Sequence, residues 1–262
     1  MNVQFAVNKT GVFILEVNPR ASRSVPFISK VLGIPWAKVA ARVMAGEKLE
    51  EIKDYGNILI YSDYQKAIKR VNYFAIKESV FPFVKFEGVD VLLGPEMKST
   101  GEVMGIDTTV AGSFVRAQDG VGTRLPTSGV AFISLKNDDK ESSVELAKKL
   151  EQMHFKLLGT EGTAKFLESK GVNIRKINKV AQGSPHIVDK LMDGKVDLVI
   201  NTPEGTGPYL DSKSIRSTAT KMSLPLYTTV AAAQSAVDAI ERLRSNTAMD
   251  VCSIQEYIAT IG

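Results

Sequence analysis

The sequence has very little of the chemistry on which disulfide frameworks, cysteine–zinc sites and histidine-based sites depend. Its 262 residues include a single cysteine, Cys252, and only two histidines, His154 and His186. One cysteine excludes an intrachain disulfide framework and a zinc site built from several cysteines, and it is typical of a reducing compartment. We therefore predict a cytoplasmic protein.

Long apolar runs and a strong charge of one sign are also lacking. No stretch of about 18 apolar residues occurs, and Met1–Asn8 contains no basic segment followed by an apolar run, so the sequence predicts neither a transmembrane helix nor a signal peptide. The 33 Lys and Arg residues against 29 Asp and Glu residues leave a net charge of only +4. That charge suits phosphorylated small molecules, but it does not point to a nucleic acid or a membrane.

The composition is that of a globular protein, with 44% hydrophobic and 24% charged residues. It excludes a disordered tail, a collagen-like repeat and a coiled coil. The length predicts two modest domains, each with its own core. A stretch rich in Gly, Pro, Thr and Ser, Gly120–Gly129, resembles a linker, and we place the boundary so that the domains span residues 1–122 and 123–262.

The first 18 residues predict a β-hairpin. Asn2–Val7 and Val12–Val17 have the composition of two strands, and successive side chains of a strand point to opposite faces of the hairpin. A three-residue loop, Lys9–Gly11, would pair Asn8 with Val12.

This pairing sorts the side chains of the hairpin onto two faces. The predicted apolar face holds Val3, Phe5, Val7, Phe13, Leu15 and Val17. The predicted polar face pairs Gln4 with Glu16 and Asn2 with Asn18, and Arg20 and Arg23 follow it. One carboxylate and two amide oxygens suit Mg²⁺, and two arginines beside the metal could neutralise a transferred phosphoryl group. The alternative interpretation is a solvated strand face with ordinary surface arginines.

Helical spacing follows the hairpin over Val25–Val31 and Pro35–Met44, and it returns over Thr108–Ala117. Between these regions the periodicity is weak, and Lys85–Asp90 and Leu93–Glu96 have the composition of loops.

Strands and helices alternate in the second half of the chain. The predicted strands are Val130–Leu135, Lys156–Leu158, Ile174–Ile177, Leu198–Asn201 and Leu226–Thr229. The predicted helices are Ser142–Gln152, Gly162–Lys170, Pro185–Met192, Ser214–Met222 and Ala231–Leu243. This alternation predicts an α/β fold with a doubly wound, five-stranded parallel sheet that binds ligands at the carboxyl ends of its strands.

A possible phosphate site lies at those carboxyl ends. In Leu158–Thr163 a strand leads into a helix through two glycines and two threonines, and the free amides of a helix N-terminus attract anions. Lys140 follows the first strand, Lys179 the third, and Asn201 and Thr202 end the fourth. The alternative is a capped turn with no ligand.

Several segments resemble a known family. Met1–Val7 followed by Leu15–Phe27 is similar to the end of an ATP-grasp domain, and more narrowly to the second ATP-grasp unit of the carbamoyl phosphate synthetase large subunit. Val39–Gly46 and Leu93–Gly105 resemble the same subunit. The resemblance covers essentially the whole chain apart from Asp54–Val71.

The resemblance implies roles for the hairpin residues. Gln4, Glu16 and Asn18 match positions that bind Mg²⁺ or Mn²⁺ with the phosphates of ATP, and Glu16 would bridge the metal ions. Arg20 and Arg23 match catalytic positions that face the transferred phosphoryl group. The other half of an ATP-grasp site would precede this sequence, so we expect the chain to be inactive alone.

From about Leu125 onward the chain resembles the methylglyoxal-synthase-like (MGS-like) fold, which is the allosteric domain of these synthetases and binds UMP or IMP. The positions that match its nucleotide site are Lys140, Thr160, Thr163 and Lys179 for the phosphate, and Asn201 and Asp211 near the base and ribose. Pro203 and Glu204 depart from the expected small, hydroxyl-bearing residues, which leaves the identity of the effector open.

Two further departures bear on function. Methylglyoxal synthase uses an aspartate as its base in a Gly-Gly-Asp segment, where this chain has Ser184, and serine cannot act as that base unaided. The family also binds ornithine, partly through an acid that matches Glu78 and a Tyr-Asp-Thr-Thr segment. Leu226–Thr229 lacks the second acid, which argues against an ornithine response.

Together these features imply a large-subunit portion of a glutamine-hydrolysing carbamoyl phosphate synthetase. This ATP-dependent ligase makes carbamoyl phosphate from bicarbonate and glutamine nitrogen for pyrimidine and arginine biosynthesis. Its expected partner is a glutamine amidotransferase small subunit. The alternative is a free-standing nucleotide-effector-binding module without catalysis, and the DNA upstream of the first codon would separate the two.

Overall fold

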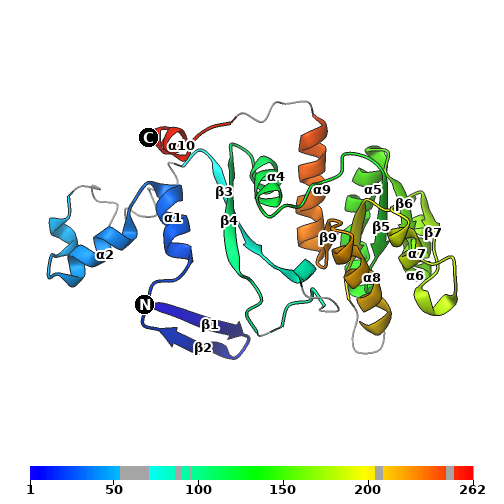
Figure 1. Cartoon of the computed structure of the whole chain (residues 1–262), viewed down its shortest axis with the longest axis horizontal. Helices are drawn as coiled ribbons and strands as arrows, with labels where there is room; N and C mark the ends of the chain where they lie inside the picture. Colours follow the sequence, from blue (N-terminus) through cyan, green and yellow to red (C-terminus); the bar gives the residue numbers. More distant parts are fainter. Residues whose placement is uncertain (54–70, 86–89, 95, 204–208, 246–250, 262) are drawn as a thin grey trace. The chain divides into compact units, whose positions relative to one another are not determined.

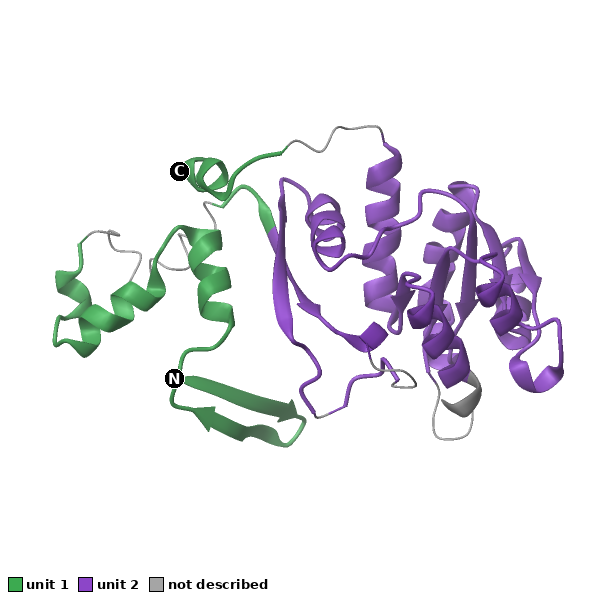
Figure 2. Ribbon diagram, in the orientation of Figure 1, with its two compact units in different colours: residues 1–74, 250–262 green, residues 75–249 purple. Residues whose placement is uncertain are grey.

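The structure is a computed structural model that describes residues 1–53, 71–85, 90–94, 96–203, 209–245 and 251–261 (Figure 1). The chain forms two compact units, which have different colours in Figure 2. Unit 1 comprises Met1–Phe74 and Asp250–Gly262, and unit 2 comprises Ala75–Met249. Among the described residues, no helix is both long enough and apolar enough to cross a membrane.

Unit 1 contains the predicted hairpin and helices, together with a C-terminal helix that the sequence did not predict. Its elements are β1 (Asn2–Asn8), β2 (Gly11–Asn18), α1 (Ser24–Leu32), α2 (Trp36–Met44), the 3-10 turn η1 (Leu49–Glu51) and α10 (Ile254–Ala259).

Helix α10 packs against α1 within unit 1. Helix α1 ends at Gly33, whose φ of 68° favours glycine, and a Cβ there would lie 2.7 Å from the Ile258 side chain. The rings of Tyr73 and Tyr257 meet edge to face at 5.3 Å, and the Tyr73 hydroxyl donates to the carbonyl of Val31. Tyr257 and Ile258 of α10 therefore contact Tyr73 and α1 within unit 1.

The hairpin turn is one residue shorter than predicted. The paired residues are Asn2–Asn18, Val3–Val17, Gln4–Glu16, Phe5–Ile14, Ala6–Phe13, Val7–Val12 and Asn8–Gly11. The Asn8 side-chain oxygen accepts hydrogen bonds from the amides of Thr10 (2.8 Å) and Gly11 (3.1 Å), which closes a two-residue turn. The predicted pairing of Asn8 with Val12 is therefore wrong.

A β-bulge restores the predicted pairing at the open end of the hairpin. The register shifts between Gln4 and Phe5, which leaves Leu15 as the extra residue, so both predicted pairs of polar residues are confirmed. On the turn side of the bulge, the residues of β2 lie on the faces opposite to those predicted. Phe13 pairs with Ala6 and lies on the face predicted to be polar.

Unit 2 contains the predicted parallel sheet, whose strand order is β7-β6-β5-β8-β9. The strands are β5 (Val130–Ser134), β6 (Lys156–Gly159), β7 (Ile174–Lys176), β8 (Leu198–Asn201) and β9 (Leu226–Tyr227). The helices are α4 (Val110–Gly120), α5 (Val144–Gln152), α6 (Glu161–Ser169), α7 (Ile187–Met192), α8 (Tyr209–Lys221) and α9 (Val230–Arg244). The 3-10 turns are η3 (Phe83–Lys85), η4 (Asn137–Asp139), η5 (Glu141–Ser143) and η6 (Val180–Gln182). The predicted fold class is confirmed.

Alternate side chains of the central strand fill two cores on opposite faces of the sheet. Ala131 and Ile133 of β5 belong to a core that includes buried residues of α4, α5, α6 and α9. Phe132, which lies between them, belongs to a core with residues of α7 and α8. This arrangement is the doubly wound layering expected for a parallel sheet.

A two-stranded sheet of β3 (Phe74–Val80) and β4 (Gly101–Asp107) was not predicted. Helix α4 follows it and packs on α9, and the Tyr227 hydroxyl donates to the side-chain oxygen of Gln118 over 3.1 Å. The predicted boundary at 122/123 thus falls inside unit 2, and the last residues of the predicted second domain lie in unit 1. The boundary itself stays a prediction.

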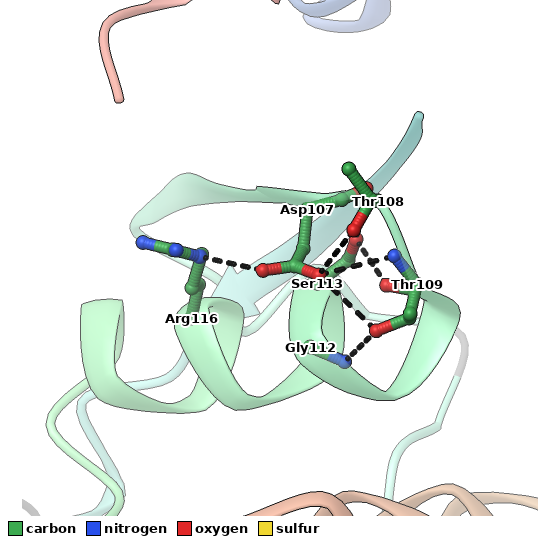
Figure 3. A network of polar contacts seen from close by, with 6 residues as sticks. All are labelled: Asp107, Thr108, Thr109, Gly112, Ser113 and Arg116. Atoms are coloured by element: carbon green, nitrogen blue, oxygen red, sulfur yellow. Dashed lines mark hydrogen bonds and ion pairs between the residues drawn. The ribbon is translucent and has the colours of Figure 1, made fainter. Parts of the chain in front are cut away.

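The turn from β4 into α4 is organised by a buried carboxylate (Figure 3). One oxygen of Asp107 accepts hydrogen bonds from the amide and hydroxyl of Thr109, both at 3.1 Å, and the other oxygen accepts one from Arg116 Nε at 3.2 Å. The Thr109 hydroxyl caps the helix by accepting from the Gly112 amide. A Cβ on Gly112 would lie 2.4 Å from the Asp107 carboxylate, so this position requires glycine.

This network predicts an acid-sensitive contribution to stability. Burial raises the pKa of Asp107, but hydrogen bonds from Thr109 and the charge of Arg116 outweigh it, so the pKa lies below its ordinary value. Asp107 therefore stabilises the fold above its unfolded pKa of about 3.9, and this contribution is lost as the pH falls through the lower folded pKa. We expect Asp107→Asn to lower the free energy of unfolding by about 1–3 kcal/mol at pH 7.

The difference between the two proteins should shrink when urea unfolding is repeated at about pH 3. Circular dichroism is the suitable signal, because the single tryptophan, Trp36, lies in unit 1. An equal difference at both pH values would contradict the role given to the carboxylate.

Candidate functional site

The polar residues of the hairpin converge on one carboxylate. Glu16 Oε1 accepts hydrogen bonds from Gln4 Nε2 at 2.7 Å and from Asn18 Nδ2 at 2.6 Å. The three side chains thus lie together, as the predicted register requires. These two bonds use the amide NH₂ groups and Oε1 of Glu16, so the atoms that a cation would take are the amide oxygens of Gln4 and Asn18 and Oε2 of Glu16.

This donor set fits a hard divalent cation. Mg²⁺ and Mn²⁺ take carboxylate and amide oxygens, and Mg²⁺ usually retains water or substrate phosphate in its remaining positions. Gln4 and Glu16 are exposed, so a bound nucleotide could complete the coordination. Among the described residues no group of three or more His, Cys, Asp and Glu side chains gathers elsewhere to hold a metal.

Arg20 and Arg23 lie between the hairpin and α1. Both are exposed, and Arg23 is the residue before the first turn of α1. The Arg20 guanidinium donates to the carbonyl of Ala21 at 3.2 Å. Neither arginine forms an ion pair with a described residue. Their predicted role, to face the transferred phosphoryl group, stays a prediction.

Buried hydroxyls mark the carboxyl edge of the parallel sheet in unit 2. Thr160, at the start of α6, lies 3.2 Å from the Ser134 hydroxyl and 3.3 Å from the Thr163 hydroxyl, which accepts from the Leu135 amide at 3.0 Å. Thr160 and Thr163 therefore lie together at this edge, where they are 4% and 1% exposed, and their role toward a phosphate stays a prediction.

One of the two predicted lysines lies beside this cluster. Lys140 Nζ donates to Asn137 Oδ1 at 2.8 Å, and a Cβ on Gly162 in the first turn of α6 would lie 3.5 Å from the same nitrogen. Lys179 follows β7 and begins η6, and its amide donates to the Gln182 side chain at 2.9 Å. A cation over the amides of a helix N-terminus suits a phosphate group.

An acidic residue at this edge, Glu161, is paired with neighbouring cations. Glu161 in the first turn of α6 forms ion pairs with Lys165 and Lys176, both at 3.1 Å. Its hydrogen bond with Lys165, and then that with Lys176, lowers the pKa of Glu161. The carboxylate is therefore paired with cations where it would otherwise repel a phosphate.

Asn201 ends β8 at the same edge. Its Cα pairs with that of Ser134, and its side chain is fully buried. The Asn201 oxygen accepts from Arg216 Nη1 at 3.1 Å, and Arg216 also pairs with Asp90. The sequence did not predict this arginine or aspartate. Asp211 lies in α8, but its side chain and Glu204 lie outside the described residues.

An aspartate, Asp189, lies close to Ser184, which occupies the position of the catalytic aspartate of methylglyoxal synthase. The Ser184 hydroxyl donates to Asp189 at 2.8 Å, and the same carboxylate oxygen accepts from the His186 amide at 2.9 Å. The hydrogen bond from His186, and then that from Ser184, lowers the pKa of Asp189. Asp189 thus caps the N-terminus of α7, and its lowered pKa makes it a weaker base than an ordinary aspartate. The His186 side chain accepts from the Asp189 amide at 3.2 Å, so His186 caps the N-terminus of α7.

A cavity of about 460 Å³ lies within unit 2, between β3 and the β9 region. Glu78 and Tyr227 line it together with Phe114, Gln118 and Leu226. Burial raises the pKa of Glu78, and burial followed by the charge of Glu78 raises the pKa of Tyr227. The cavity thus combines apolar walls with one carboxylate that a cationic ligand would stabilise.

Comparison with known proteins gives a match for the region of the hairpin and another for the region of the parallel sheet. Residues 1–52 match the family model described as carbamoyl-phosphate synthase L chain, ATP binding domain, and residues 142–228 match the MGS-like domain. By sequence, the chain is a relative of the carbamoyl phosphate synthase large chain. It is 48% identical over 257 residues to that protein of Brucella suis biovar 1 (strain 1330), with 98% of this chain and 22% of the relative covered.

Other large chains are similar to the same extent. That of Myxococcus xanthus (strain DK1622) is 49% identical over 258 residues, with 98% of this chain and 23% of the relative covered. That of Pseudomonas aeruginosa is 46% identical over 241 residues, with 92% of this chain and 21% of the relative covered. The chain therefore spans about a fifth of the length of these large chains, and the resemblance seen in the sequence is confirmed.

Proposed function

We propose that the chain is the C-terminal part of the large subunit of a glutamine-hydrolysing carbamoyl phosphate synthase. It would supply the metal-binding edge of the site that phosphorylates carbamate, together with the nucleotide effector domain. The observation that carries this proposal is the Glu16 carboxylate, which accepts from both Gln4 and Asn18 and leaves their oxygens for a cation. The match of residues 1–52 to an ATP-binding domain of this synthase supports it.

In this proposal Gln4, Glu16 and Asn18 hold Mg²⁺ or Mn²⁺ with ATP, and the bound metal would neutralise phosphate charge. Arg20 and Arg23 would stabilise charge on the transferred phosphoryl group from the segment that follows the hairpin. A single hairpin cannot enclose a nucleotide, so we expect the chain to be inactive alone. The glutamine amidotransferase small subunit would be its partner in a cytoplasmic enzyme.

The effector proposal rests on the edge of the parallel sheet. Lys140, Lys179, Thr160 and Thr163 would bind the phosphate of UMP or IMP, and Asn201 and Asp211 would lie near the base and ribose. The hydroxyl cluster and the cation over the first turn of α6 support this assignment. Glu78 provides one carboxylate in the separate cavity. The segment Leu226–Thr229 adds none, so ornithine should have little effect.

Calorimetry with UMP and with IMP tests the effector proposal. We expect Lys140→Ala and Lys179→Ala each to weaken binding by about tenfold to a hundredfold, because each removes a charge-assisted contact to phosphate. Lys195→Ala is the matched control, since Lys195 pairs with Asp193 at 2.7 Å and precedes β8, at the opposite end of that strand from Asn201. Unchanged affinity in both lysine variants, or no binding of either nucleotide, would rule out this role.

The alternative, a free-standing effector module without catalysis, predicts the same nucleotide binding. It also predicts that the gene has no upstream ATP-grasp half. Sequencing the DNA before the first codon separates the two: an open reading frame that continues upstream in frame supports the synthase, and a stop codon with a promoter supports the module.

A further inference from the structure

The largest fully buried side chain among the described residues is a charged one, Arg216 of α8. Its guanidinium binds Asp90 in a two-pronged ion pair, with Nε 2.8 Å from Oδ1 and Nη2 2.5 Å from Oδ2. The Asp90 side chain is only 9% exposed. A charge this deeply buried persists only when it is paired and hydrogen-bonded, so the geometry of this pair is tightly determined.

The third nitrogen of the guanidinium fixes the orientation of Asn201. Nη1 of Arg216 lies 3.1 Å from Asn201 Oδ1. Arginine can only donate, so the side-chain oxygen of Asn201 must face it and the NH₂ group must face elsewhere. Nδ2 of Asn201 is buried and has no hydrogen-bond partner within the described part of the chain. A buried donor without a partner is costly, and a ligand acceptor atom would relieve that cost.

This donor lies at the edge of the sheet where the phosphate residues gather. Asn201 pairs in register with Ser134, whose hydroxyl is 3.2 Å from that of Thr160. Thr202, the next residue, accepts from the Lys136 amide at 3.0 Å and so ties the ends of β5 and β8 together. The amide of Asn201 and the hydroxyl cluster are therefore parts of one continuous edge.

Asp90, which anchors the arginine, comes from a different part of the chain. It precedes β4 and lies 126 positions before Arg216. Its carboxylate also accepts from the Leu92 amide at 3.2 Å, and the flanking Val91 and Leu93 line the cavity that contains Glu78. The orientation of Asn201 thus depends on a segment outside the residues 142–228 that match the MGS-like domain.

We propose that Asp90 and Arg216 are positioning residues for the effector site. By holding the oxygen of Asn201, they present its NH₂ group to a hydrogen-bond acceptor on the nucleoside part of a phosphorylated ligand. The pair therefore sets a preference for nucleotides over ligands that offer a sugar phosphate alone. This inference rests on the proposed effector function.

Arg216→Lys is the sharpest test, because it keeps a cation beside Asp90 but removes the planar fork that also reaches Asn201. The probes are UMP, IMP and ribose 5-phosphate, measured by calorimetry on the whole chain. We expect the tighter-binding nucleotide to lose about tenfold in affinity, which is the loss of about one hydrogen bond, while ribose 5-phosphate changes by less than about twofold. Arg116→Lys is the matched control, since Arg116 also pairs with a buried aspartate, Asp107, and should change neither affinity.

Asp90→Asn provides a second variant with the same expected pattern. A ligand-free measurement separates this inference from the effector function: in an NMR spectrum of the selectively labelled chain, Arg216→Lys should shift and broaden the side-chain amide signals of Asn201. If no probe binds the wild-type chain, the effector function fails, while the NMR result still judges the positioning pair. Equal losses for nucleotide and ribose 5-phosphate, or unchanged Asn201 signals, would overturn the proposal.

Discussion

Glu16→Gln is expected to reduce carbamate-dependent ATP turnover by at least about 100-fold in a synthase large chain that contains this segment. The substitution preserves shape and most of the local hydrogen bonding. The glutamine oxygen can still accept from Gln4 Nε2 and Asn18 Nδ2, which now lie 2.7 Å and 2.6 Å from Glu16 Oε1. What is lost is the negative charge and the second acceptor oxygen, which the proposal assigns to the metal ion.

The measurement is carbamoyl phosphate formation by the large chain assembled with its small subunit. ATP hydrolysis dependent on bicarbonate alone should be retained, because the proposed role of Glu16 is limited to the second phosphorylation. Glu50→Gln offers a matched control, since Glu50 is an exposed glutamate of the same unit outside the hairpin. Full carbamoyl phosphate synthesis by the Glu16→Gln enzyme would show that this hairpin does not hold the metal.

The polar face of the hairpin could be predicted from the sequence because alternation and register suffice to bring Gln4 and Glu16 together. The turn could not be predicted in the same way. A two-residue turn alone would have moved the pairing by one residue, and the bulge at Leu15 cancels that shift. The missed bulge thus compensates for the wrong turn length at the open end, whereas Val12, Phe13 and Ile14 near the turn lie on the faces opposite to those predicted.

The parallel sheet was predictable because each strand is a short apolar run followed by a helical pattern. Strands β3 and β4 were missed, since Glu78, Lys77 and Glu102 interrupt their apolar residues and give no clean alternation. The pairing of Asp90 with Arg216 was missed for a different reason. Periodicity reports on neighbours within one element, and no local pattern connects two residues that are 126 positions apart.

Arg216→Met should lower the free energy of unfolding of unit 2 by about 3–5 kcal/mol, because it leaves the carboxylate of Asp90 buried without its cation. It also removes the donor to Asn201, so Asp90 and Asn201 both lose hydrogen bonds in one substitution. Urea unfolding followed by circular dichroism at pH 7 measures the loss. Arg175→Met, at an exposed position of the edge strand β7, is the control and should change stability by less than about 0.5 kcal/mol.

The double variant Asp90→Leu with Arg216→Met decides whether the loss comes from the unpaired charge. With both charges removed, the Asn201 oxygen and the Leu92 amide each lose a hydrogen bond, but neither charge of the pair is left buried alone. The double variant should therefore be more stable than Arg216→Met alone, by about 2 kcal/mol. A double variant that is less stable than the single one would mean that packing around Arg216, and not its charge, holds α8 in place. A buried ion pair is poor evidence for stability, because an apolar pair can often replace it. If the double variant recovers stability but binds UMP and IMP no better than Arg216→Lys does, the pair serves the orientation of Asn201 rather than the stability of the fold.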